Sequence, residues 1–133
     1  MKEQAHGIFQ VTLDNHIIEC VLKGSFNEVG CLAYTTRVKE EVTALNGQPF
    51  AMLIDDLDLE GGTPEAYEVL NQYNHWLSNH PLAAKALIIN SIIQKEIMLQ
   101  QAPSLKSQNI EFFTDKEDAK KWLNKQLLNY NNT

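Results

Sequence analysis

Hydrophobic and polar residues alternate over residues 8–13 and again over residues 16–23, a period of two that is typical of half-buried β-strands. Asp14-Asn15 lies between the two segments, and both residue types tolerate the positive φ angles of a two-residue hairpin turn. The amino-terminal part of the chain therefore predicts a β-hairpin. The apolar residues that define the alternation are Phe9, Val11, Leu13, Ile18, Cys20 and Leu22.

Four later segments carry apolar residues three and four positions apart, the spacing of amphipathic helices. Three of them follow a capping box, in which a hydroxyl and a carboxylate or amide each bond a free backbone N–H. These boxes are residues 25–28, 91–94 and 114–117. The remaining helix begins at Thr63-Pro64, an N-cap followed by proline at the first helical position. Its apolar stripe is Ala66, Val69, Leu70, Tyr73 and Leu77.

Short apolar runs between the helices predict three further strands, at residues 50–55, 84–90 and 110–113. Residues 103–108 are predicted to form a polar loop. The resulting order, β-β-α-β-α-β-α-β-α, is typical of an α/β domain with right-handed crossovers. We expect a five-stranded, mostly parallel sheet with an antiparallel amino-terminal edge strand and four main helices. Residues 1–128 are predicted to form one domain, and residues 129–133 a frayed tail.

Charge and composition narrow the classes of function. The chain has 133 residues, 44% of them apolar, and a net charge of −6 without a run of lysine or arginine. Nucleic acids and anionic membrane surfaces attract clustered cations, so neither is expected as a partner. We found no apolar segment approaching the ~20 residues of a membrane span, and residues 1–6 lack the apolar core of a signal peptide. With only two cysteines, a cytoplasmic location with reduced thiols is expected.

The stretch after the strand at 50–55 concentrates polar side chains where open α/β sheets place their ligands, at the carboxyl end of a central strand. We interpret residues 56–63 as an acidic loop leading into the second helix. The candidate binding residues there are Asp56, Asp58, Glu60, Thr63 and Tyr67.

This stretch lacks residues that each known type of site would need. Asp56-x-Asp58-x-Glu60 begins like a calcium loop, but Tyr67 occupies the place of the bidentate glutamate. The same acidic residues resemble the start of a haloacid dehalogenase-type phosphatase, whose downstream lysine and acidic pair we do not find. The four histidines form no ligand set, and Cys31 has no visible base and fits a core position. No catalytic residue, metal site or cofactor is predicted.

The predicted order of elements, with several short sequences, resembles the STAS domains (sulfate transporter and anti-sigma-factor antagonist), and most closely the stand-alone bacterial proteins called SpoIIAA-like. The shared sequences are Lys23-Gly24, residues 51–55 and residues 112–123. Anti-sigma-factor antagonists carry a phosphorylated serine at the start of the helix after the central strand. This chain has Glu60-Gly-Gly-Thr63-Pro64 there, so the resemblance implies a regulatory domain without that phospho-serine switch.

Two functions of different classes remain open. The first is a non-catalytic regulatory or protein-interaction domain that binds a partner or a second copy of the chain. The second is a carrier of a small hydrophobic or lipid-like ligand held between sheet and helices, which the resemblance suggests by analogy. An enclosed apolar cavity would favour the carrier, and an exposed patch would favour the partner binder.

Helical geometry places two aromatic residues beside the buried stripe of the second helix. At ~100° per residue, Tyr67 and Trp76 lie on opposite flanks of the stripe. Partly exposed aromatics next to acidic residues are typical of a recognition patch. We therefore expect Tyr67, Asp58 and Glu60 to border an interaction site, whereas Trp76 is more simply covered by a neighbouring element.

Overall fold

The computed structural model describes residues 3–132, which form one five-stranded sheet in the order β1-β2-β3-β4-β5. β1 pairs with β2 in antiparallel fashion, and all other neighbours are parallel. The alternation at the amino terminus and the apolar runs after it account for this arrangement, and the predicted sheet topology is confirmed. The strands are β1 (Ile8–Asp14), β2 (Ile17–Phe26), β3 (Phe50–Gly62), β4 (Leu82–Ile88) and β5 (Ile110–Phe113).

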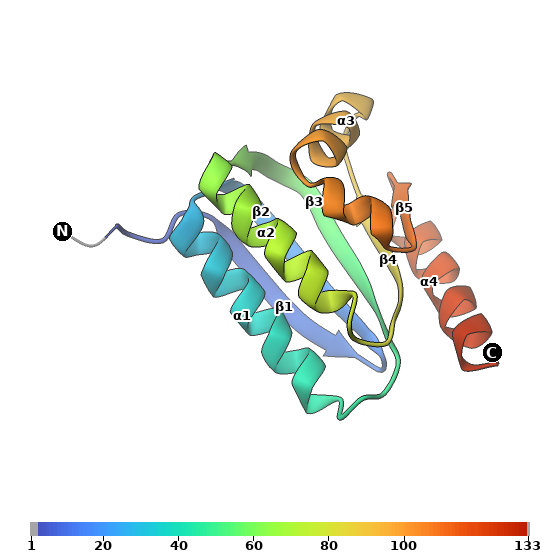
Figure 1. Ribbon diagram of the computed structural model, residues 1–133. Coiled ribbons are helices and arrows are strands. Elements are labelled where there is room, and N and C mark those ends of the chain that lie inside the picture. The colour runs from blue at the N-terminus through green and yellow to red at the C-terminus, as the bar shows by residue number, and fades with distance from the viewer. Residues whose placement is uncertain (1–2, 133) are drawn as a thin grey trace.

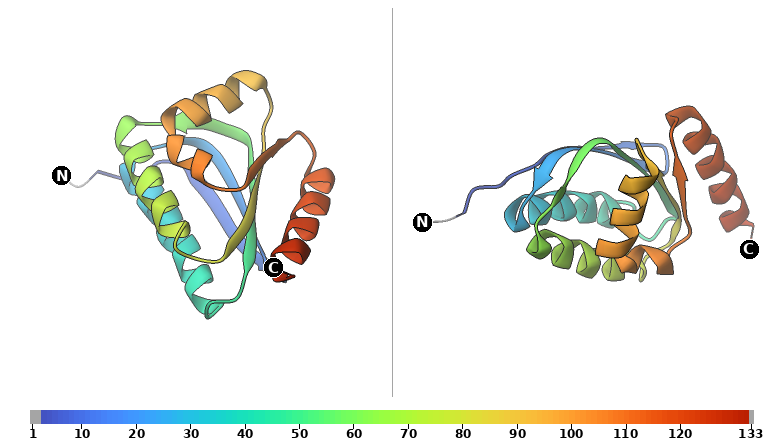
Figure 2. Two further views of the ribbon diagram at one scale, coloured as in Figure 1. Left: turned by 45° about the vertical axis from the view of Figure 1, so that its right-hand side comes forward. Right: turned by 90° about the horizontal axis from the view of Figure 1, so that it is seen from above.

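Helices cover the two faces of the sheet unequally. In Figure 1, α1 and α2 lie side by side in front of the strands, whereas α4 lies apart from them beyond β4 and β5. Figure 2 shows the sheet as a curved layer with α1 and α2 on one side, and α3 near one end of the strands. The helices are α1 (Glu28–Ala44), α2 (Pro64–Leu77), α3 (Ile92–Gln101) and α4 (Lys116–Asn131), with a short 3₁₀ helix, η1 (Pro103–Ser107).

Alternation along the strands sends successive side chains to opposite faces and produces two cores. On the α1–α2 face, the side chains of β2 and β3 pack against Tyr34, Val38 and Tyr73 of the helices. On the α4 face, Leu123 and its neighbours on the helix pack against a second set of strand residues. That second set is Ile17, Ala51, Leu53, Ala83, Ala84, Ala86 and Ile88.

β3 corrects one prediction. The strand does not end at Asp55 but continues to Gly62, so the predicted loop at 56–63 is largely extended strand. The extension pairs with β2 through two register shifts, after Asp55 and after Leu59. The physical reason is that β2 is long enough to provide a hydrogen-bonding partner for residues 58–62, whereas β4 pairs with β3 only as far as Asp55.

Two capping boxes are also corrected. Asn27, not Ser25, is the N-cap of α1, and its side chain accepts a hydrogen bond from the Gly30 N–H, while Ser25 remains in β2. Asp115, not Thr114, caps α4. In both cases a carboxylate or amide side chain one or two residues later competes successfully with the hydroxyl. The predicted cap of α3 at Ser91 is confirmed.

Two further boundaries differ from the sequence-based expectation. The polar segment 103–108 contains the 3₁₀ helix η1, which buries Leu105 and Ser104 against the core. α4 continues to Asn131, into the segment predicted to fray, and Thr133 of that segment lies outside the described residues. Leu13, predicted to share a buried face, is 40% exposed, because it lies near the end of the edge strand.

Candidate functional site

The carboxyl-terminal half of β3 projects beyond β4 and sets the position of the predicted acidic residues. Asp58 and Glu60 are exposed there, and Glu60 accepts a hydrogen bond from the Ser25 hydroxyl of β2 at 3.3 Å. The side of the extension that β4 does not reach is occupied by amides. Asn90 Nδ2 donates to the Leu57 carbonyl at 2.9 Å, and Gln94 Nε2 donates to the Asp56 carbonyl at 2.6 Å. α3 is therefore fastened to β3 next to the acidic side chains.

A surface groove lies between the β3 extension, the start of α2 and α3. Its volume is about 220 Å³. Two isoleucines of α3 line it and are exposed, Ile93 by 69% and Ile97 by 47%. We call this surface the β3–α3 groove. It is lined by Leu59, Glu60, Gly61, Tyr67, Asn90, Ser91, Ile93, Gln94, Ile97 and Met98.

Of the predicted site residues, Glu60 and Tyr67 line the groove, and Asp58 is exposed on the same extension of β3. Tyr67 is half-buried and packs against the core. Trp76 is covered in part, since its ring stacks on His80 with centroids 3.9 Å apart and the Lys39 ammonium lies 5.3 Å from its centroid.

Thr63 is the N-cap of α2, as predicted. Its hydroxyl oxygen accepts a hydrogen bond from the Ala66 N–H at 3.1 Å. The side chain is exposed at the helix start, with Pro64 at the first helical position. The hydroxyl thus satisfies one of the free N–H groups of the helix.

Asp56 lies elsewhere, and its expected place in a solvated acidic loop is wrong. The side chain is only 3% exposed and lines a cavity of about 70 Å³ between the sheet and α1, α2 and η1. Asp56 follows Met52 and Ile54 at the period of two and is buried on the same face of the sheet as they are. Its Oδ1 atom has no hydrogen-bond partner among the described residues.

A buried lysine lines the same cavity. Lys85 of β4 is 3% exposed, and its ammonium donates to Asn74 Oδ1 at 3.0 Å and lies 5.7 Å from the ring centroid of Tyr73. Asn74, itself 1% exposed, donates in turn to the Ser104 hydroxyl at 3.0 Å. We call this space, with Asp56 and Lys85 in its walls, the interior cavity.

The two ionisable groups are both destabilised in their charged forms. Burial raises the pKa of the Asp56 carboxyl to about 7, and Asp55 acts in the same direction, while Lys85 opposes the shift. Burial lowers the pKa of the Lys85 ammonium to about 8, against smaller raising effects of Cys20 and Asp56. The two groups form no ion pair within 4 Å in the described part of the chain, so neither fully compensates the other.

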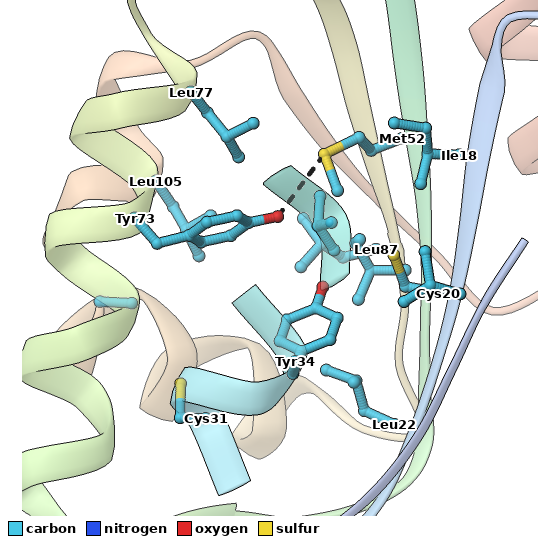
Figure 3. Packing of buried hydrophobic residues seen from close by; sticks show 14 of the residues in the cluster. Ile18, Cys20, Leu22, Cys31, Tyr34, Met52, Tyr73, Leu77, Leu87 and Leu105 are labelled. Atoms are coloured by element: carbon cyan, nitrogen blue, oxygen red, sulfur yellow. Dashed lines mark hydrogen bonds between the residues drawn. The ribbon is translucent and has the colours of Figure 1, made fainter. Parts of the chain in front are cut away.

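The remaining wall of the cavity is aromatic and aliphatic. Figure 3 shows Tyr34 of α1 and Tyr73 of α2 pointing toward the strands, with the Tyr73 hydroxyl directed at the sulfur of Met52. That O···S distance is 3.9 Å. Burial raises the pKa of the Cys20 thiol to about 12 and of the Cys31 thiol to about 11, so both sulfurs stay neutral. Both thiols are therefore poor nucleophiles.

Sequence reasoning missed Lys85 and Asn74. Lys85 carried a signal, because it is the one cation inside the apolar run of residues 82–89. Asn74 lies four residues after Leu70 on the stripe of α2, where a polar residue is unexpected. Lone buried polar residues of this kind require partners.

Within residues 3–132, no helix has the length and apolar character needed to cross a lipid bilayer. Over the same residues, no group of three or more histidine, cysteine, aspartate or glutamate side chains is arranged to hold a metal ion.

Comparison with known proteins gives structural neighbours only. No protein-family model matches the sequence, and no curated protein matches it. An uncharacterized protein of the DUF3478 family from Shewanella loihica, with a SpoIIAA-like fold, is 16% identical with a TM-score of 0.68, over 92% of this chain and 98% of that one. An anti-sigma factor antagonist from Mycobacterium paratuberculosis is 13% identical with a TM-score of 0.64, over 90% and 95% of the two chains. The chain therefore has a SpoIIAA-like α/β fold.

Proposed function

We propose that this chain is a non-catalytic regulatory domain that binds a protein partner through the β3–α3 groove. The observation that carries the proposal is the exposure of Ile93 and Ile97 in the lining of a groove of about 220 Å³. Exposed apolar side chains gathered in one place mark interaction sites more often than isolated ones do. Tyr67 adds an aromatic wall to the groove.

The charges around the groove indicate the chemistry of the partner. Asp58 and Glu60 are exposed on β3, and Glu96 is exposed on α3. An apolar groove with an acidic rim fits an amphipathic segment that carries lysine or arginine beside its apolar side chains. One structural neighbour is named for antagonism of an anti-sigma factor, a protein target, which supports a protein partner here.

The size of the interior cavity supports this proposal over a carrier of lipid-like ligands. Its volume, about 70 Å³, is about half of the ~150 Å³ of an engineered cavity that binds benzene. Two buried ionisable groups in its walls also suit an alkyl chain poorly.

The proposed domain lacks the phospho-serine switch of the antagonists. Thr63, the hydroxyl at the corresponding place, already caps α2 through the Ala66 N–H. Mass spectrometry of the protein purified from its native host is expected to show unmodified Thr63. Phosphate on that residue would contradict this part of the proposal.

Site-specific photo-crosslinking in cells tests the groove. A photoreactive amino acid at position 93 is expected to capture one dominant protein, whereas the same group at position 128 is not. Leu128 is the matched control because it is 62% exposed on α4, away from the groove. Equal labelling from both positions would reject the groove as the interaction site.

A binding assay with the captured protein then measures how much the groove contributes to the affinity. Ile93→Asp should weaken association by about tenfold or more, equivalent to ~1.4 kcal/mol, because it places a charge in an apolar contact. The melting temperature should not change, since Ile93 is 69% exposed. If native mass spectrometry shows a dimer that Ile93→Asp converts to a monomer, the partner is a second copy of the chain.

A further inference from the structure

We infer that the interior cavity is a binding site for a small neutral molecule with a primary carboxamide group and a short apolar body. The site is separate from the proposed interaction surface, although Leu59, Tyr67 and Met98 line both the cavity and the β3–α3 groove. These three side chains form the wall between the cavity and the outside of the molecule.

The first argument is an unsatisfied acceptor. Asp56 Oδ1 is buried and has no hydrogen-bond partner in the described part of the chain. A buried polar atom without a partner is rare in proteins and costs free energy, so it requires either a ligand or ordered water. The adjoining space of about 70 Å³ is several times what one water molecule needs.

The second argument is a donor on the same cavity. The Lys85 ammonium has three N–H groups, and the described hydrogen bonds use one of them, to Asn74 Oδ1. A ligand that satisfies both walls must therefore offer a donor to Asp56 and an acceptor to Lys85. A primary carboxamide offers both from adjacent atoms, through its NH₂ group and its carbonyl oxygen.

Other chemical groups also combine a hydrogen-bond donor with an acceptor. Among them, the charges of the cavity favour the neutral amide. Asp56 and Lys85 carry opposite charges when both are ionised, so a neutral ligand leaves the cavity without net charge. A zwitterion would bring two more charges into a space with mostly apolar walls, at a further desolvation cost.

The other walls define the body of the ligand. They are the aliphatic side chains of Leu22, Ile54, Leu87 and Leu105 with the rings of the tyrosines. These surfaces favour a short alkyl group, and the volume limits the ligand to a few non-hydrogen atoms.

Propionamide and 2-butanone are a matched pair of probes. They have nearly the same shape and both carry a carbonyl oxygen, but a methyl group replaces the NH₂ group in the ketone. The experiment is an NMR titration of the full chain, following the methyl signals of Leu22, Leu59 and Met98. Propionamide is expected to shift these signals saturably, with a dissociation constant in the millimolar range or tighter.

The ketone should bind about tenfold more weakly or worse, because it leaves Asp56 without a donor. Lys85→Met should weaken propionamide binding by a similar factor, whereas Lys106→Met, a matched change at an exposed lysine of η1, should not. The comparison of the two probes on the unmodified chain does not depend on whether the Lys85 variant folds.

Two results would overturn the inference. Equal affinities for the amide and the ketone would show that the cavity selects only by size. Methyl signals that do not shift up to the solubility limit of propionamide would show that ordered water alone occupies the space between Asp56 and Lys85.

Discussion

The two faces of the sheet are packed in different ways. On the α4 face, Ala84, Ala86 and Ile88 of β4 pack with Ala119 and Leu123 in an apolar cluster. On the α1–α2 face, the same strand presents Lys85, and the adjacent β3 presents Asp56, beside a cavity. The comparison indicates that one face contributes mainly stability, while the other gives up some stability for groups that can bind.

The largest effect is expected from truncation on the α4 face. Leu123→Ala should lower the free energy of unfolding by about 3 kcal/mol, because the side chain is fully buried between small residues that cannot close the space. Chemical denaturation measures the change.

Leu128→Ala is the matched control, since that leucine of the same helix is 62% exposed, and its effect should stay within about 0.5 kcal/mol. Similar losses for both variants would mean that α4 is not closely packed on the sheet.

A gain in stability is expected on the α1–α2 face. Asp56→Asn should raise the free energy of unfolding by about 2 kcal/mol at pH 8, because it removes a buried charge that lacks a partner. The gain depends on pH. The pKa of Asp56 is raised from 3.8 to about 7 on folding, so its carboxyl costs nothing below pH 3.8 and most above pH 7.

Denaturation of both proteins across this pH range is the measurement. The difference between Asp56→Asn and the unmodified chain should vanish as the pH falls toward 3.8. Asp58→Asn changes an exposed carboxylate and should leave the pH dependence as it is. A constant difference at all pH values would show that Asp56 is not buried as a charge.

The smallest losses of stability are expected when an N-cap is removed, and they should be similar for helices on the two faces of the sheet. Thr63→Ala and Asp115→Ala each remove an N-cap, of α2 and α4 respectively. Each should lower the free energy of unfolding by about 1 kcal/mol. Thermal unfolding of the two variants tests whether the faces differ only in their interiors. A much larger loss for Thr63→Ala would give the start of α2 a further role in the fold.

Most of the fold could be predicted because each element carries its own signal. The alternation in β1 and β2 and the Thr63-Pro64 start of α2 are local features that tertiary contacts do not override. The end of β3 could not be placed, because its continuation depends on pairing with β2 and on two register shifts. A local signal was nevertheless present, since Leu57-Asp58-Leu59-Glu60 alternates with a period of two.

The site was harder to predict than the fold because burial decides the role of a charged residue. Glu60 and Tyr67 line the same groove, as their closeness in sequence around the start of α2 suggests, and their role in binding stays a prediction. Asp56 and Lys85 are distant in sequence and meet only because β3 and β4 are neighbours in the sheet. A cluster of acidic residues does not show which member points inward, so Asp56 could not be separated from Asp58.

The projecting half of β3 also has a consequence for solubility. Beyond Asp55 its backbone has a side that β4 does not cover, and such an edge is a template on which strands of other molecules can add. The amides of Asn90 and Gln94 bond two of its carbonyls, and Asp58 and Glu60 place negative charge along it. Like charges on two edges repel one another, so these residues oppose the growth of the sheet from one molecule into the next, most of all during synthesis, before α3 has folded over the edge.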